Sequence, residues 1–246
     1  MSRRHDVVLS DVTKRYGETD ALSNLELRVP RGAVYGFLGP NGAGKTTTMR
    51  ILATLTSPTT GEVEVAGYSL DQSAAIRGAI GYLPDTPPVY EELTGREQLR
   101  HIARLRDIPA NQTEERLQQL SERFKIREAL DDRIANYSTG MRQKLGITQT
   151  LLHDPAVVLL DEPTSGLDPG ATDRVKEAVT ELAADDVTVF FSSHVLSIVE
   201  ELADQVGVLS EGELVDEGTP SSLVAQVEED ETLEDAFFTA TSSQPH

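Results

Sequence analysis

Apolar and polar residues alternate in short segments over the first third of this chain of 246 residues. The segments "DVVLSDVTKRYG", "LSNLELRVPRG" and "GEVEVAGYSL" show this period of two, and Gly and Pro residues separate them. Such alternation is typical of strands with one buried face. We expect these segments, at residues 6–17, 22–32 and 61–70, to form a small antiparallel sheet.

Residues 33–55 combine a continuous apolar run with a glycine-rich turn and a helical pattern. The run "AVYGFL" has the length of a buried strand, and "GPNGAGKTTTMRILATL" follows it directly. We therefore expect a strand, a turn and a helix here, in that order.

Residues 88–150 change to helical spacing and contain no strand candidate. Thr94 and Thr113 stand where they can cap the first two helices of this block. Strands return in "AVVLLD", "VTVFFSS" and "QVGVLS", with helical patterns between them. Near-continuous apolar strands that alternate with helices predict a parallel sheet covered on both faces. The fold class is therefore α/β, with the helical block inserted into one domain.

The last stretch, residues 221–246, is acidic and then polar. Within it, "TLEDAFF" at 232–238 has the pattern of a short docked helix, and the final residues have the composition of a disordered tail. We expect one domain over residues 1–220, followed by a partly disordered acidic extension.

The charge balance is strongly acidic, with 22 basic and 41 acidic residues and a formal net charge of −19. Such a surface disfavours nucleic acid, which requires clustered Lys and Arg. Lysine is scarce among the basic residues, and this combination predicts a halophilic protein, since molar salt screens charge repulsion within ~3 Å. An ordinary acidic protein is the alternative. No apolar run approaches the ~20 residues of a membrane-spanning helix, so any membrane role must come through partners.

The segment "GPNGAGKT" matches the phosphate-loop pattern of Gly, four residues, Gly, Lys and Thr. Backbone N–H groups of such a loop and of the following helix point at phosphate oxygens, and glycine lets the chain approach closely. Lys45 is placed to reach the β- and γ-phosphates, and the Thr46 hydroxyl is placed to bind Mg²⁺. The predicted phosphate-binding residues are Gly39, Pro40, Asn41, Gly42, Ala43, Gly44, Lys45, Thr46 and Thr47.

A pair of acidic residues ends the later strand "AVVLLD" and begins "EPTSGLDP". Asp161 can hold Mg²⁺ directly or through water, and Glu162 can polarise the water that attacks a phosphate. Two solvated acids at a strand end are the alternative. With a phosphate loop in the same chain, we predict that Lys45 and Glu162 are catalytic and that Thr46 and Asp161 bind metal.

With these motifs in this order, residues 6–220 resemble an ATP-binding cassette ATPase, the nucleotide-hydrolysing subunit of ABC transporters. The resemblance implies a P-loop NTPase core with a mainly parallel sheet, an N-terminal antiparallel β subdomain and a helical subdomain inserted at about residues 88–150. It also implies that ATP and Mg²⁺ are the cofactors.

The stretch "YSTGM", residues 137–141, resembles the family's signature motif, which contacts the γ-phosphate of ATP held by the partner subunit. The resemblance assigns Ser138 and Gly140 to that contact. A capped helix start is the alternative, since Ser138 is a good N-cap. The stretch departs from the commonest form, Leu-Ser-Gly-Gly-Gln, and is similar to a subgroup of exporters of drugs, polysaccharides or sodium.

The resemblance assigns four further residues to the site. His194 matches the family's catalytic switch histidine, and Tyr16 resembles the aromatic residue that stacks on adenine. Asp85 stands where the family has a Gln that contacts Mg²⁺, and Asp168 would bridge the two subunits beside the nucleotide. The alternatives are structural: a satisfied histidine, a strand-end tyrosine, a loop acid and a helix cap.

The implied function is that of an ATP-hydrolysing subunit of an ABC exporter, paired with a second ATP-binding subunit and driving transmembrane permease subunits. It would lie peripherally on the cytoplasmic face of the cell membrane. Arg96, Arg100 and Arg104 share one helix face, in a region that the family places near coupling helices of the permease; a solvated face is the equal alternative. Two other functions stay open: a non-transport ABC clamp, and a degenerate subunit, permitted by Asp85 and Thr139, that binds ATP beside an active sister.

Overall fold

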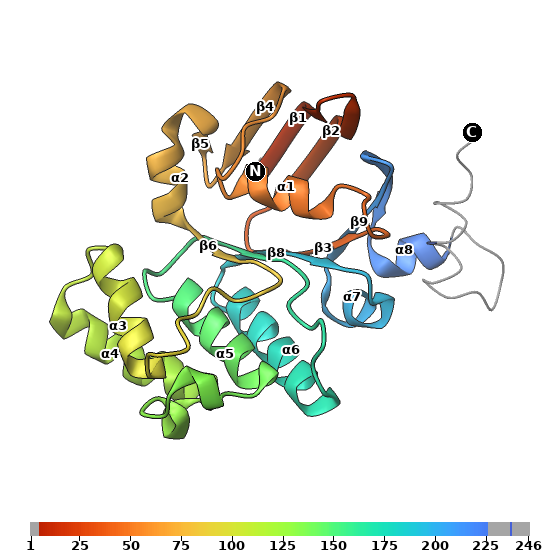
Figure 1. Cartoon of the computed structure of the whole chain (residues 1–246). Coiled ribbons are helices and arrows are strands. Elements are labelled where there is room, and N and C mark those ends of the chain that lie inside the picture. The colour runs from red at the N-terminus through yellow and green to blue at the C-terminus, as the bar shows by residue number, and fades with distance from the viewer. Residues whose placement is uncertain (1–4, 226–236, 238–246) are drawn as a thin grey trace.

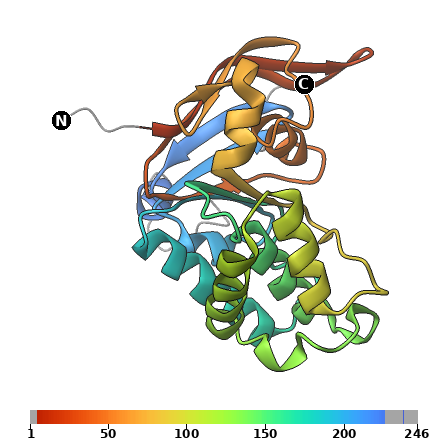
Figure 2. The ribbon, with the colours of Figure 1, turned by 90° about the vertical axis from the view of Figure 1, so that its left-hand side faces the viewer.

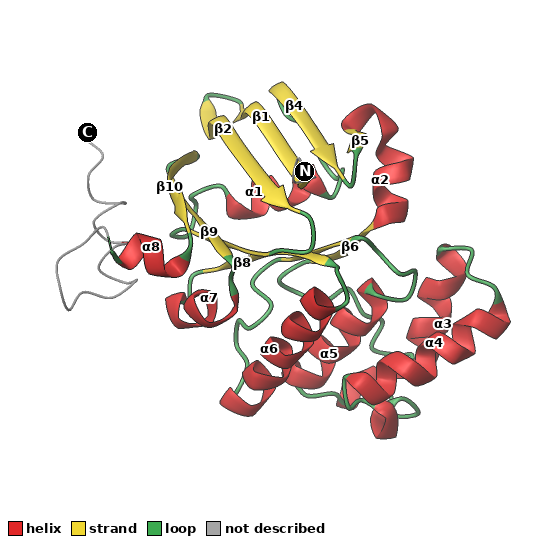
Figure 3. Cartoon of the chain, turned by 180° about the vertical axis from the view of Figure 1, so that it is seen from behind, coloured by secondary structure: helices red, strands yellow, loops and turns green. Residues whose placement is uncertain are grey.

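The computed structural model of the chain describes residues 5–225 and Phe237. Two β-sheets lie one above the other with helix α1 (Lys45–Leu52) between them, and helices from later in the chain cover the far face of the second sheet (Figure 1). The view from behind shows the same layers (Figure 3).

The first sheet is antiparallel and comes from the N-terminal part of the chain. On its strand β4, Val63 and Val65 are buried whereas Glu62 and Glu64 are exposed, as a strand with one buried face requires. The predicted N-terminal antiparallel sheet is confirmed. Its order is β2-β1-β4-β5, with β1 (His5–Tyr16), β2 (Thr19–Pro30), β4 (Thr60–Val65) and β5 (Tyr68–Ser69).

The second sheet is mainly parallel and has the order β10-β9-β3-β8-β7-β6. Only β10 runs antiparallel, against β9 at one edge. The carboxyl ends of parallel strands meet at one edge of a sheet, so the segments that follow β3, β7 and β8 lie together. The strands are β3 (Val34–Leu38), β6 (Ile80–Leu83), β7 (Val157–Leu160), β8 (Thr188–Ser193), β9 (Gln205–Ser210) and β10 (Glu213–Gly218).

Two hydrophobic cores lie on opposite faces of this sheet. Between the sheets, Tyr35, Phe37 and Phe190 pack with residues of α1, and the rings of Tyr35 and Phe190 stack at 5.3 Å. On the other face, Val34 and Leu38 pack with the covering helices. Neighbouring residues of β3 therefore enter different cores, which explains why the whole strand is apolar. The covering helices are α5 (Thr139–Thr150), α6 (Pro169–Ala184) and α7 (Leu196–Leu202).

The helical block between β6 and β7 begins with α3 (Gly95–Leu105) and α4 (Ala110–Arg123) and ends with α5. Figure 2 shows α3 and α4 below the sheets. Thr94 caps α3 as predicted, since its hydroxyl accepts the N–H of Glu97 at 3.2 Å. The prediction that Thr113 caps α4 was wrong. The helix begins at Ala110 after Pro109, whose fixed φ favours a helix start, and Thr113 lies inside the first turn.

Several elements were not predicted, among them α2 (Ser73–Ala79), β6 and β10. At the C-terminal end, α8 (Pro220–Val224) buries Leu223 in the core beneath the sheet. The division at residue 220 stays a prediction. Of the expected helix at 232–238, only Phe237 is described, and it packs against that same core; the rest of the acidic extension lies outside the described residues. Within the described ranges, none of the helices combines the length and apolarity that a membrane span requires.

Candidate active site

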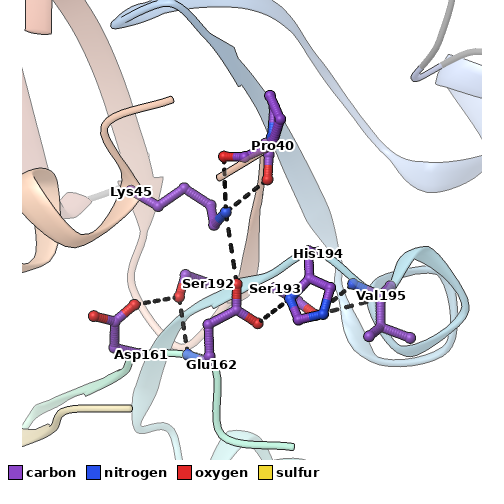
Figure 4. Close-up of polar contacts among 9 residues, drawn as sticks. Pro40, Lys45, Asp161, Glu162, Ser192, Ser193, His194 and Val195 are labelled. Atoms are coloured by element: carbon purple, nitrogen blue, oxygen red, sulfur yellow. Dashed lines mark hydrogen bonds and ion pairs between the residues drawn. The ribbon is translucent and has the colours of Figure 1, made fainter. Parts of the chain in front are cut away.

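The phosphate loop follows β3 and passes over the edge of the parallel sheet into α1. Gly44 has φ +112°, and a Cβ at this residue would lie 2.6 Å from the Ala21 carbonyl oxygen, so the bend requires glycine. Lys45 is 6% exposed, and its Nζ donates to the carbonyl oxygens of Gly39 at 2.6 Å and Pro40 at 3.2 Å (Figure 4). The loop thus encloses the ammonium group of Lys45. The first backbone N–H groups of α1 have no preceding helical turn to bond to, so they are available to phosphate oxygens.

A cavity of about 260 Å³ opens over this loop. Two acidic side chains from other segments line it: Asp85, after β6, and Glu162, after β7. The N–H of Thr86 donates to Asp85 Oδ1 at 2.7 Å, which holds the Asp85 carboxylate within its own loop. The other residues that line the cavity are Ala21, Pro40, Asn41, Gly42, Gly44, Lys45, Thr46 and Thr47.

Glu162 joins the phosphate loop to the segment after β8. Its Oε2 lies 2.8 Å from His194 Nδ1, and its Oε1 lies 3.6 Å from Lys45 Nζ (Figure 4). The Glu162 side chain is 16% exposed, whereas that of His194 is 52% exposed. The three predicted catalytic residues are therefore in one connected group, with the carboxylate between a cation and an imidazole. Such a carboxylate can accept a proton at the mouth of a phosphate site.

Asp161 lies beneath this group and is 1% exposed. Burial raises the pKa of the Asp161 carboxyl, and the nearby charges of Asp85 and Glu162 raise it further, against the lowering effect of hydrogen bonds from the Ser192 and Thr46 hydroxyls. Burial also raises the pKa of the neighbouring Tyr82 to about 12. Asp161, Asp85 and Glu162 thus bring acidic groups close together beside the loop that carries Lys45.

The predicted metal ligands supply hard oxygen donors, namely a hydroxyl from Thr46 and carboxylates from Asp161 and Asp85. Among the described residues, no group of three or more His, Cys, Asp or Glu side chains forms a complete metal cage. Mg²⁺ is usually held by one or two carboxylates together with substrate phosphates and water. The donor set therefore fits Mg²⁺ that arrives with a nucleotide.

Six predicted nucleotide-binding residues do not line the cavity: Gly39 and Ala43 of the loop itself, and Tyr16, Ser138, Gly140 and Asp168 from other segments. Ser138 caps α5, since its Oγ accepts the N–H of Met141 at 3.3 Å, and Asp168 caps α6 by accepting the N–H of Ala171 at 2.9 Å. Gly140 lies against the same Ala171, so the starts of α5 and α6 are adjacent. Tyr16 ends β1 and is 49% exposed. The capping alternatives are thus realised, and the nucleotide roles of these residues stay predictions.

Ser192 is part of the site and was not predicted. Its hydroxyl contacts both Asp161 and the backbone of Glu162 (Figure 4). The only signal in the sequence is a pair of serines at the end of an otherwise apolar strand, just before His194.

Comparisons with known proteins agree with this geometry. Residues 22–165 match the family model described as ABC transporter. The chain is 39% identical over 221 residues to a daunorubicin resistance ATP-binding protein of Streptomyces coeruleorubidus, covering 89% of this chain and 70% of that protein. It is 37% identical to a bacitracin transport ATP-binding protein of Enterococcus faecalis, covering 91% and 72%.

A solved structure of an ATP-binding subunit of an ABC transporter superposes with a TM-score of 0.86 at 30% identity, covering 95% of this chain and 98% of that one. The predicted P-loop NTPase fold is confirmed by this likeness and by the mainly parallel sheet. The chain belongs to the ABC transporter family, as an ATP-binding subunit that hydrolyses ATP.

Proposed function

We propose that this ATPase powers an exporter and that Lys45, Glu162 and His194 carry the hydrolysis. The observation that supports these roles is the connected group they form at the mouth of the phosphate-loop cavity. In the structure Lys45 Nζ contacts two loop carbonyl oxygens and the Glu162 carboxylate. Phosphate oxygens of ATP are better acceptors for this ammonium group, so Lys45 turns to them when ATP binds.

Glu162 then acts on the water that attacks the γ-phosphate. Its carboxylate orients that water and accepts a proton from it, while His194 holds the carboxylate by the 2.8 Å hydrogen bond. Glu162 has φ +48°, in the left-handed region, so the chain places this side chain with a backbone conformation that is unfavourable for glutamate. Such strain is retained where the surrounding contacts and the chemistry require it.

Thr46, Asp161 and Asp85 are the proposed Mg²⁺ ligands, and two of them, Thr46 and Asp85, line the cavity. When bound, the ion neutralises charge on the phosphates. Burial raises the pKa of the Asp161 carboxyl, so a bound cation would stabilise its ionised form, and this supports the assignment.

The site is proposed to be completed by a second copy of the chain or by a related subunit. Ser138 and Gly140 lie at the start of α5, a helix of 12 residues, and do not line the cavity around Lys45. Their N–H groups and the positive end of the helix dipole suit the γ-phosphate of ATP held by the other subunit. Asp168 and Ala171 lie at the adjacent start of α6, and this region is proposed to meet the other subunit.

Transport requires permease subunits, and a groove of about 540 Å³ is the proposed contact. Leu55 and Leu105 line it and are 63% and 67% exposed, and Arg77 and Arg106 add positive charge. The expected arginine face of α3 contributes less, because Arg96 pairs with Asp131 and Arg100 with Glu114 within the chain. The groove suits an apolar permease segment that carries acidic residues, and the chain would therefore be peripheral on the cytoplasmic side of the membrane.

Export is the proposed direction of transport. The two relatives described above are named for daunorubicin resistance and bacitracin transport. The signature stretch of this chain resembles that of a subgroup of exporters, and this resemblance favours the same direction.

The first experiment is the mass in solution of Glu162→Gln protein, with and without ATP, in molar KCl. Loss of the carboxylate is expected to slow turnover about 10²-fold to 10⁴-fold, so that ATP stays bound and two copies pair. Ser138→Asp in the same background is the matched variant. Asp still caps α5 but places a negative charge toward phosphate, so ATP binding persists and pairing is lost. Unchanged turnover in Glu162→Gln would contradict the catalytic roles, and pairing that survives Ser138→Asp would contradict the contact across subunits.

A further inference from the structure

The Ser192 hydroxyl lies between the two acidic residues of the site. Ser192 is fully buried near the end of β8, beside β7, which leads into Asp161 and Glu162. Its Oγ donates to Asp161 Oδ1 at 2.6 Å and accepts the backbone N–H of Glu162 at 3.0 Å (Figure 4). A hydroxyl has a single hydrogen to donate, and a carboxylate can only accept, so the direction of both bonds is fixed.

Each of these bonds controls a different part of the site. The bond to Asp161 selects one orientation of a buried carboxylate that is proposed to bind Mg²⁺. The bond from Glu162 N–H holds the backbone of the proposed base at φ +48°, together with a bond from Ser165 N–H to the Glu162 carbonyl oxygen. Without the hydroxyl, this N–H would lose its partner, and the left-handed conformation would lose one of the hydrogen bonds that hold it.

The neighbouring serine does not share this arrangement. Ser193 is also fully buried, but its Oγ accepts the N–H of Val195 at 2.9 Å and stays within its own segment. Successive residues of a strand point to opposite faces of the sheet, so the two serines lie on different faces and only Ser192 lies on the face where it meets Asp161. The contact to both acids is therefore specific to residue 192.

We propose that Ser192 is a positioning residue that fixes the metal carboxylate of Asp161 and the water-activating carboxylate of Glu162 with one hydroxyl. The inference rests on the proposed roles of those two residues. Ser192 is fully buried and does not line the cavity, so it would act through these two residues and not on the nucleotide. Its contribution is to keep two adjacent side chains of one loop in the relative orientation that hydrolysis requires.

Ser192→Thr and Ser192→Val test this directly, because Thr and Val have nearly the same shape and differ by the hydroxyl. The Val variant is expected to have a kcat about 10-fold to 100-fold below that of the Thr variant, with the KM for ATP within about 3-fold. Binding of a fluorescent ATP analogue in EDTA is expected to be equal in the two variants. In a separate titration without EDTA, the Mg²⁺ concentration that gives half of the maximal change in analogue fluorescence is expected to be higher for the Val variant than for the Thr variant.

Equal kcat values in the Thr and Val variants would overturn the inference. A loss of analogue binding in EDTA by the Val variant that is as large as its loss of turnover would also overturn it, because such a loss would indicate general disruption of the site. If the added methyl groups prevent folding, Ser192→Ala is compared with the wild type by the same measurements. Glu162→Gln is assayed alongside. If Glu162→Gln keeps full turnover, the catalytic role of Glu162 fails; if it loses turnover while Val retains it, only the role of Ser192 fails.

Discussion

Two glycines of the phosphate loop differ in what a side chain would meet, and this difference predicts a measurable contrast. Gly42 has φ +86°, and no heavy atom lies within 4 Å of a Cβ built there. Gly44 has φ +112°, and its Cβ would lie 2.6 Å from the Ala21 carbonyl oxygen and 2.7 Å from Leu22 Cδ2. Alanine at either residue strains the backbone, but only Gly44→Ala adds a collision with a neighbouring strand.

The two contributions can be separated in magnitude. A positive φ costs a residue with a Cβ about 1–2 kcal/mol, which is the expected loss in the free energy of unfolding for Gly42→Ala. Overpacking adds about 1–3 kcal/mol, so the expected loss for Gly44→Ala is about 2–5 kcal/mol. In a chain of this size, each kcal/mol lowers Tm by about 2–4 °C, which gives losses of about 2–8 °C and 4–20 °C.

The assay is thermal and urea denaturation of both variants and of the wild type, followed by circular dichroism without nucleotide and in one fixed salt concentration. Measurement without nucleotide keeps ATP binding out of the comparison, because a ligand that binds only the folded state raises its stability. Equal losses for the two variants would refute the reasoning, since they would mean that the strand carrying Ala21 and Leu22 moves away at little cost.

Three further predictions concern the site and the surface. Asp161→Asn is expected to increase the free energy of unfolding in EDTA at pH 7 and to abolish turnover. Because the pKa of Asp161 is raised in the folded state, its ionised form destabilises the fold. The stability difference between Asp161→Asn and the wild type should therefore shrink as pH falls and the wild-type carboxyl protonates. Urea titrations at two pH values measure this difference. Tyr16→Ala is expected to weaken ATP binding about 2-fold to 12-fold, whereas Tyr16→Phe keeps it, as a fluorescent analogue would report; equal affinities would remove Tyr16 from the nucleotide site. The net charge of −19 predicts a higher Tm in molar KCl than in dilute buffer, and equal melts in both would contradict a halophilic protein.

The phosphate loop and the two acids after β7 were predictable because their residue types follow from the chemistry of phosphate and Mg²⁺. Apolar runs likewise marked β3, β7 and β8. Strand β6 was missed because it combines a length of four residues with Gly81, whereas β7 is equally short but consists only of Val and Leu. Edge strand β10 was missed because it carries Glu213, Asp216 and Glu217. Short or polar strands are defined by their partners, and a single sequence does not show partners.

Ser192 shows what local pattern reasoning leaves out. Its contacts depend on the register of β7 against β8, in which Leu160 lies opposite Phe191, so that the next residues, Asp161 and Ser192, fall side by side. A shift of one residue would turn Ser192 to the other face of the sheet. The contact between His194 and Glu162 depends on the same register.

The place of β3 in the parallel sheet has a consequence for the order in which a ribosome can build this protein. The strands β1, β2, β4 and β5 are complete once residue 69 has been made. By contrast, β3 lies between β8 and β9, which end at residues 193 and 210. At usual rates of synthesis, β3 and the phosphate loop after it wait roughly 10–30 s for those neighbours. During that interval the apolar strand "VYGFL" is made but unpaired, and a nascent chain released before residue 188 has no parallel neighbour to position its phosphate loop.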